Sequence, residues 1–125
     1  MSSFHIREDP SGVGDGEDVV VLVVGGEVDY TAGPQLEERV AGHIDAGVRR
    51  MMLDLTTATF IDSTVIGVLV GAAARLRKLG GGAVVAVCGG ADERIPQIFE
   101  VAGVESIIPL YHSRLEAMSA LLARR

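Results

Sequence analysis

Hydrophobic positions follow two patterns along the chain, and their alternation predicts an α/β domain. Largely aliphatic runs at residues 19–24, 49–55 and 83–88 are typical of strands that a sheet buries on both faces. The first of these runs is expected to end at the glycine pair that follows it. Residues 4–8 alternate apolar and polar side chains, which predicts an edge strand that pairs antiparallel with the next strand. Residues 106–108 are expected to form a short last strand.

The segments between the predicted strands show helical spacing. After Pro34, which suits a first helical turn, apolar residues recur every four positions and predict an amphipathic helix. Residues 65–79 predict a second helix, whose first turns are apolar on every side. A helix of that kind is either wholly buried or meets a partner. The apolar positions of the first helix are Leu36, Val40, Ile44 and Val48.

Two shorter helices are predicted in the last third of the chain. Asp92 can cap a helix that Gly103 ends in a left-handed conformation, and Ser113 can cap a C-terminal helix. The predicted order is ββαβαβαβα. It describes a single domain over residues 1–125, with a mixed, mostly parallel sheet of about five strands and about four helices. The shared apolar face of the last helix is expected to consist of Leu115, Met118 and Leu122.

Composition and charge narrow the range of functions. The net charge is -6, and no basic cluster is longer than Arg75, Arg77 and Lys78, which argues against direct binding of nucleic acid. Cys88 is the only cysteine and the three histidines are scattered, so the sequence predicts neither a disulfide nor a metal site. No apolar run is long enough to span a bilayer and no signal peptide is recognisable, so we expect a cytoplasmic protein that needs no cofactor and no membrane.

The sequence does not indicate a catalytic site. It contains no Gly-x-Ser-x-Gly elbow, no Gly-x-Gly-x-x-Gly turn and no Walker lysine. Asp54 and Asp62 could meet at the carboxyl end of the sheet, where α/β folds place ligands. The early acidic pair that would accompany a phosphoacceptor aspartate is absent, however. We therefore predict that the protein is not an enzyme.

One polar stretch, Asp62-Ser63-Thr64, lies where a predicted strand gives way to the apolar helix. All three residue types cap helices, because their side-chain oxygens accept hydrogen bonds from the free amides of the first turn. A structural cap is therefore one interpretation. A phosphate on Ser63 would also be stabilised there, and it would repel a partner docked on the adjacent apolar surface. Gly67 and Gly71 either let another backbone approach or serve packing of the helix on the sheet.

These stretches and two others resemble the STAS domain family, specifically the bacterial anti-sigma factor antagonists. The likeness extends over nearly the whole chain. It implies the STAS fold. The stretches that carry it are Gly26-Glu27-Val28-Asp29 with Pro34 and Leu36, Leu53-Asp54-Leu55 with Phe60-Ile61-Asp62-Ser63-Thr64, residues 98–104, and residues 109–117.

The resemblance implies a switch between partners. In that family the serine directly after the aspartate, here Ser63, is phosphorylated by the anti-sigma factor, a serine kinase of the histidine-kinase-like ATPase type. A metal-dependent serine phosphatase reverses the modification. The unphosphorylated form binds the anti-sigma factor and so releases a sigma factor for transcription, typically in a stress response. The partner-binding residues that the resemblance implies are Asp29, Asp62, Ser63, Thr64, Val65, Ile66, Gly67 and Val68.

Two positions differ from the family. Where the family usually has glycine after Asp-Ser-Ser/Thr, this chain has Val65, whose β-branched side chain would narrow a partner's approach to Ser63. Where the family commonly has threonine three residues after the first aspartate, this chain has Ala32, with Thr31 one position earlier. The sequence leaves open an alternative function, a STAS scaffold or ligand-sensing module that is not phosphorylated.

Overall fold

A six-stranded sheet with helices on both faces makes up the fold. The computed structural model describes residues 3–10, 19–89 and 94–123. Its elements are β1 (Phe4–Glu8), β2 (Val19–Val28), the 3-10 turn η2 (Tyr30–Ala32), α1 (Gly33–Asp45), β3 (Arg50–Asp54), β4 (Ala58–Ile61), α2 (Ser63–Lys78), β5 (Ala83–Val87), α3 (Arg94–Ala102), β6 (Leu110–Tyr111) and α4 (Arg114–Ala123).

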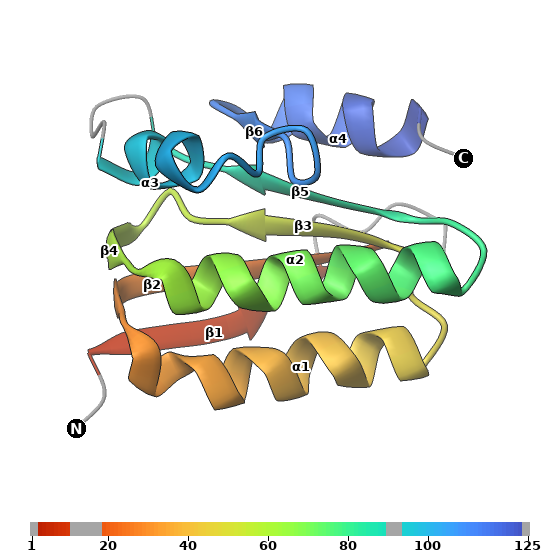
Figure 1. The fold of residues 1–125 in the computed structure, drawn as a ribbon, viewed down its shortest axis with the longest axis horizontal. Coiled ribbons are helices and arrows are strands. Elements are labelled where there is room, and N and C mark those ends of the chain that lie inside the picture. Colours follow the sequence, from red (N-terminus) through yellow and green to blue (C-terminus); the bar gives the residue numbers. More distant parts are fainter. Residues whose placement is uncertain (1–2, 11–18, 90–93, 124–125) are drawn as a thin grey trace.

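The sheet has the strand order β1-β2-β3-β5-β6, and β4 pairs with the far end of β2 (Figure 1). β1 is antiparallel to β2, whereas every other pairing is parallel. The aliphatic side chains of β2, β3 and β5 are buried, as expected for strands that carry helices on both faces. The predicted α/β class, the mixed sheet and the antiparallel edge strand are confirmed.

The two faces of the sheet are covered unequally. The main core lies on the face where α1, α2 and α3 pack, and it includes Leu36, Val40 and Ile44 of α1 at their predicted four-residue spacing. On the opposite face α4 packs against β3 and β5 and closes a smaller cluster. The helix pair α1 and α2 lies side by side with both N-terminal ends at the same end of the molecule (Figure 1).

The prediction that the first long strand ends at the glycine pair was wrong. β2 continues through Gly25 and Gly26 to Val28 by changing partners, from β3 to the unpredicted strand β4. Gly26 adopts a φ of 81°, and a Cβ there would lie 2.2 Å from the carbonyl oxygen of Ser3, so only glycine fits this irregular step in the ladder. The glycines therefore mark a change of partner within one strand.

Two expectations near the C-terminus need correction. The last strand is residues 110–111 rather than 106–108. Ile108 is buried in a turn, where its backbone N–H donates a hydrogen bond to the carbonyl oxygen of Val104. In α4 the buried residues are Ala117 and Leu121. Leu115 is 83% exposed, Leu122 is 48% exposed, and Met118 lies at the margin of the cluster, so the predicted apolar face is not the one that packs.

The predicted ends of the helices were partly right. Ser113 accepts a hydrogen bond from the Glu116 amide at the start of α4, and Gly103 has a φ of 68° after α3, both as predicted. α2 begins at Ser63, two residues earlier than expected. The predicted cap Asp92 lies outside the described residues.

Arg114 ties the first turn of α4 to the sheet. Its guanidinium donates to the carboxylates of Asp54, at 2.6 Å, and of Asp9, at 2.7 Å. Burial alone would raise the pKa of Asp54, but hydrogen bonds from Thr56 and the ion pair with Arg114 outweigh it and hold that pKa below its ordinary value of 3.8. Asp54 is therefore a buried carboxylate with a structural role.

Replacing Arg114 by methionine is expected to destabilise the domain by about 2 kcal/mol at neutral pH, because the buried Asp54 loses its counter-ion. A depressed pKa stabilises the fold above the unfolded value of 3.8, and this contribution is lost as the pH falls through the folded pKa. The difference between the two proteins should therefore shrink at acid pH. Urea unfolding of both proteins at neutral and at acid pH measures this difference in the free energy of unfolding.

The matched control is Arg39→Met, which removes an ion pair with Glu8 whose two side chains are 42% and 43% exposed. That change is expected to cost less than about 1 kcal/mol because solvent screens the pair. Equal losses in the two variants would contradict the structural role of Arg114.

Candidate functional site

The pairing of β2 with β4 brings two helix starts together. Val28 and Ile61 are partners in the parallel ladder, and each is the last residue of its strand. The next residues, Asp29 and Asp62, therefore leave the sheet side by side. Each aspartate begins a helical segment, η2 with α1 in one case and α2 in the other.

Both aspartates cap their helices through the same local bond. Asp62 Oδ1 accepts from the Thr64 amide at 2.9 Å, and Asp29 Oδ1 accepts from the Thr31 amide at 3.0 Å. Asp29 also accepts from the Thr31 hydroxyl, and the two bonds from this threonine lower the pKa of Asp29, the hydroxyl contributing most. The structural cap predicted for the Asp-Ser-Thr stretch is confirmed for Asp62.

Thr31 takes over the capping role that the threonine expected at the position of Ala32 would have. Ala32 is buried and makes no side-chain cap bond, whereas Asp29 with Thr31 holds the start of the preceding turn. Next to them, Gly33 packs so closely against α2 that a Cβ would lie 2.7 Å from Cγ2 of Thr64. The two helix starts are thus in direct contact and form one closely packed corner of the domain.

Asp54, which the sequence suggested could meet Asp62, lies in a third Asp-x-Thr turn and is not part of this site. Asp54 Oδ1 accepts from the Thr56 amide at 2.9 Å, the same local bond as in the two caps. Its second oxygen is taken by Arg114, and the side chain is 6% exposed. Among the described residues no group of three or more acidic, histidine or cysteine side chains could hold a metal ion.

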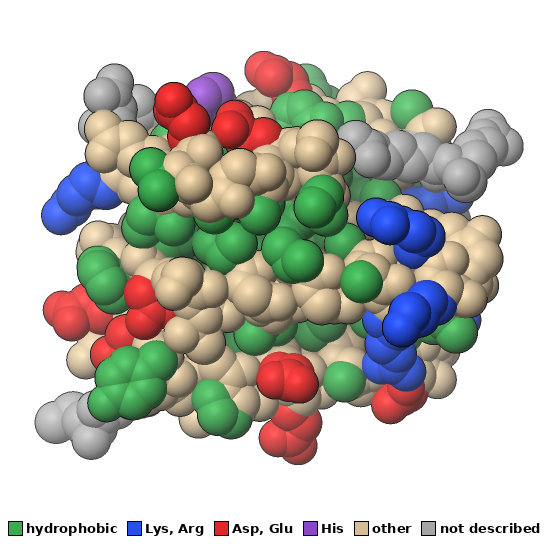
Figure 2. Space-filling model, in the orientation of Figure 1, with side chains coloured by type: hydrophobic (Ala, Val, Ile, Leu, Met, Phe, Trp, Pro, Cys, Tyr) green, Lys and Arg blue, Asp and Glu red, His purple; other side chains and the backbone are tan. Residues whose placement is uncertain are grey.

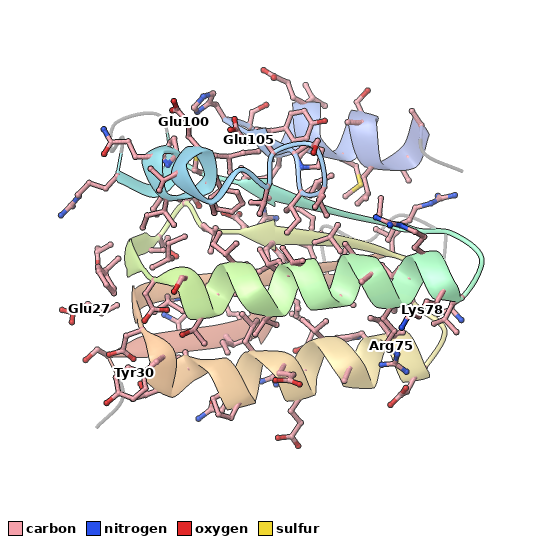
Figure 3. All side chains as sticks on the ribbon, viewed as in Figure 1. Glu27, Tyr30, Arg75, Lys78, Glu100 and Glu105 are labelled. Atoms are coloured by element: carbon pink, nitrogen blue, oxygen red, sulfur yellow. The ribbon has the colours of Figure 1, made fainter. Side chains whose placement is uncertain are left out.

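Ser63 is exposed at the first position of α2. Around it lie acidic and aromatic side chains that the sequence had not singled out. Tyr30 is 70% exposed on η2, which contacts α2, and Phe60 is 48% exposed on β4 opposite Glu27 of β2. Figure 3 shows Glu27 and Tyr30 at this end of the molecule.

The structure divides the predicted partner-binding residues into two groups. Val65 and Ile66 are 0% and 5% exposed, so their side chains belong to the core and form no part of the surface beside Ser63. Val65 therefore does not narrow the approach to Ser63, contrary to the expectation from its shape. The side chains of Thr64, Val68, Asp29 and Asp62 are only partly buried and so remain available at the surface.

The outer face of α2 is built from small residues. Gly67 and Gly71 are exposed, and a Cβ at either position would meet nothing within 4 Å, so packing on the sheet does not explain these glycines. With Ser63 and Ala74 they form an outward stripe of small residues. α2 is accordingly buried on one side only, and its surface lets another molecule come close to the helix backbone.

Charge is distributed unevenly along α2. Figure 2 shows basic side chains gathered over its C-terminal end, on the right, and acidic side chains near its N-terminal end, on the left. The basic residues are Arg75, Arg77 and Lys78 in the last turn, where cations favour the helix dipole. Arg75 forms an ion pair with Asp45 at the end of α1.

The site is thus a corner of a small α/β domain with an exposed hydroxyl beside a helix face that another molecule can approach closely. The STAS domain family matches residues 15–117, and the chain belongs to that family. The resemblance drawn from the motifs is confirmed. Anti-sigma factor antagonists of this family are non-enzymatic regulators. None of the helices in the part of the chain that is described could cross a membrane.

Two relatives show the likeness in sequence. BtrV of Bordetella bronchiseptica, provisionally named an anti-sigma factor antagonist, is 30% identical over 102 residues, which are 82% of this chain and 85% of BtrV. The anti-sigma-B factor antagonist of Listeria monocytogenes is 31% identical over 94 residues, or 74% of this chain and 79% of its own.

Solved structures show the likeness in fold. The anti-sigma factor antagonist SpoIIAA in its unphosphorylated form has a TM-score of 0.77 at 17% identity, covering 95% of this chain and 97% of SpoIIAA. The phosphorylated form of SpoIIAA from Bacillus has a TM-score of 0.67 at 16% identity, covering 93% and 98%. The fold is therefore shared across large differences in sequence.

Replacing Asp62 by alanine is expected to destabilise the domain by about 1 kcal/mol, because the Thr64 amide loses its cap. Ser63→Ala is the matched control and should change the free energy of unfolding by less than about 0.5 kcal/mol, since the Ser63 side chain is exposed. Thermal and urea unfolding measure both. If the two variants were equally stable, Asp62 would not be the cap that holds this helix start.

Proposed function

We propose that the protein is an anti-sigma factor antagonist in which Ser63 is the phosphorylation site. The observation that carries the proposal is the exposed Ser63 hydroxyl at the first position of α2, directly after the capping Asp62. This is the position of the modified serine in the motif that the chain shares with the family. The relatives named anti-sigma factor antagonists support the same conclusion.

In the proposed reaction the anti-sigma factor is itself a serine kinase that binds ATP and transfers the γ-phosphoryl group to Ser63. Ser63 Oγ forms a bond to the γ-phosphorus, the bond from that phosphorus to the β-phosphate oxygen breaks, and ADP leaves. The hydroxyl proton passes to a base on the kinase. A metal-dependent phosphatase would return the serine by hydrolysis. The chain contributes the acceptor hydroxyl and a surface that holds it in place.

The phosphate is expected to leave the fold unchanged. At the start of α2 it would gain about 0.3–1 kcal/mol from the helix dipole and the first-turn amides. The neighbouring carboxylates of Asp62 and Asp29, both only partly buried, would oppose it, and solvent screens that repulsion. The core side chains of α1 and α2 point away from this surface, so neither effect is expected to force a rearrangement.

Binding should respond far more strongly than folding. A hydroxyl docked against the kinase faces the nucleotide, and a phosphate at the same place would be forced against the ATP phosphates with both groups desolvated. A penalty of about 3 kcal/mol lowers affinity by roughly two orders of magnitude. The unphosphorylated chain would then bind the anti-sigma factor and free a sigma factor, and the phosphorylated chain would release it.

Ser63→Ala is expected to abolish phosphate transfer from a purified anti-sigma factor kinase encoded in the same genome, because the acceptor hydroxyl is gone. It should keep its affinity for the ADP-bound kinase within a few-fold, whereas Ser63→Glu should bind at least about tenfold more weakly. Transfer is followed with labelled ATP and intact-mass analysis, and affinity by calorimetry.

Thr31→Ala is the control for a second hydroxyl in the same corner, since Thr31 is exposed on η2, which contacts α2. It should still accept one phosphate. Persistent labelling of Ser63→Ala, or loss of labelling in Thr31→Ala with Ser63 intact, would assign the modification elsewhere. A chain that no such kinase binds or labels would contradict the proposed function as a whole.

A further inference from the structure

A groove between α1 and α2 continues the Ser63 surface away from the phosphorylation site. It has a volume of about 510 Å³ and runs from Thr64 at the start of α2 to Arg75 near its end. At 1.5 Å per residue this is a length of about 16 Å, or three helical turns. Apolar side chains of both helices form its floor, and it begins at the residue next to Ser63.

The shape of the groove fits a row of side chains. Val40 and Ile44 of α1 and Ala72 of α2 are almost fully buried in the floor, while Val68 remains half-exposed. Gly67 and Gly71 have no side chains, so the α2 side of the groove is shallow, and each has open space where a side chain would extend. The volume is too small to take a whole helix. It fits aliphatic side chains presented at i, i+4 and i+7 by a helix lying across it.

Charge complementarity determines the kind of partner. The far end of the groove is closed by the Arg75–Asp45 ion pair, and Lys78, which follows Arg75 by three residues on the same side of α2, is exposed beyond it (Figure 3). Arg77 lies on the opposite side of the helix. An element that follows the groove from Ser63 therefore passes Glu37 and ends over the cation Lys78. An acidic side chain at that end of the partner would complete the contact.

We infer that the anti-sigma factor lays an amphipathic helix along the α1–α2 groove, with aliphatic side chains in the groove and an acidic side chain over Lys78. This inference rests on the proposed function, since it names the contact by which the same partner reaches Ser63. The basic end lies about 20 Å from Ser63, beyond the Debye length of about 8 Å at physiological salt. The contact there is thus independent of the charge on Ser63.

Filling the groove tests the inference. Gly71→Leu adds a side chain at a groove-lining position where a Cβ would meet no atom within 4 Å, and leucine is a better helix former than glycine. It is expected to raise the KM for phosphate transfer to Ser63, or the Kd for the ADP-bound kinase, about tenfold with kcat unchanged. The matched control is Gly42→Leu, an equally open glycine of α1 that lines a different, polar surface, and it should change neither constant by more than about twofold.

A second variant tests the charge. Lys78→Glu should lower the affinity about fivefold at low salt and flatten its salt dependence, equally in wild-type and Ser63→Ala backgrounds, whereas Arg77→Glu, on the opposite side of the helix, should change the affinity by less than about twofold. Groove and Lys78 variants that are bound and labelled like wild type would overturn the inference and leave the proposed function standing. Sedimentation should show a monomer. A dimer that Gly71→Leu dissociates would overturn the inference by assigning the groove to a second copy of the chain.

Discussion

The parallel pairing of Val28 with Ile61 is the contact on which the candidate site depends. It exists because β2 exchanges β3 for β4 at Gly26, where only glycine can take the required backbone conformation. The exchange carries two strand ends to the same corner. Two Asp-x-Thr caps then start two helices in contact with each other, and Ser63 lies exposed in the first turn of one of them.

This arrangement separates the surface around Ser63 from the packing that stabilises the domain. The inner faces of α1 and α2 are packed on the sheet, and Asp54 with Arg114 holds α4 at a different place. What remains outside near Ser63 consists of small, acidic and aromatic side chains that contribute little to the core. In the proposed function, a phosphate there acts on a docked partner by about 3 kcal/mol and leaves the packed core untouched, so the proposed switch needs no change of shape.

The sequence predicted the elements whose signal is local. Continuous aliphatic runs located β2, β3 and β5, the four-residue spacing located α1, and the capping residues of the Asp-Ser-Thr stretch located the start of α2 to within two residues. β4 was missed because it is short and pairs only with the tail of β2, which the glycine pair concealed. The last strand was misplaced because Ile108 is apolar for burial in a turn rather than for pairing.

The surface could be predicted only in part. An apolar helix sequence does not reveal which residues face outward, so Val65 and Ile66 were assigned to the surface although they lie in the core. In α4 the small residue Ala117 faces the sheet, because the helix packs directly against β3 and β5. A hydrophobicity pattern favours the larger residues for this position and so does not predict it. Asp-x-Thr recurs at residues 29–31, 54–56 and 62–64 but starts a helical segment at only two of these places, so the motif alone did not reveal that the two helix starts are equivalent.

The central claim is that Ser63 is modified on a closely packed corner and that the effect stays local. Comparing the amide NMR spectra of the unmodified and Ser63-phosphorylated chain tests it most directly. The account predicts that changes in chemical shift are confined to residues 27–33 and 60–68, with slow hydrogen exchange kept throughout β2, β3 and β5. Shifts spreading to α4 and β6, or loss of exchange protection in the sheet, would show a global change of conformation and contradict it.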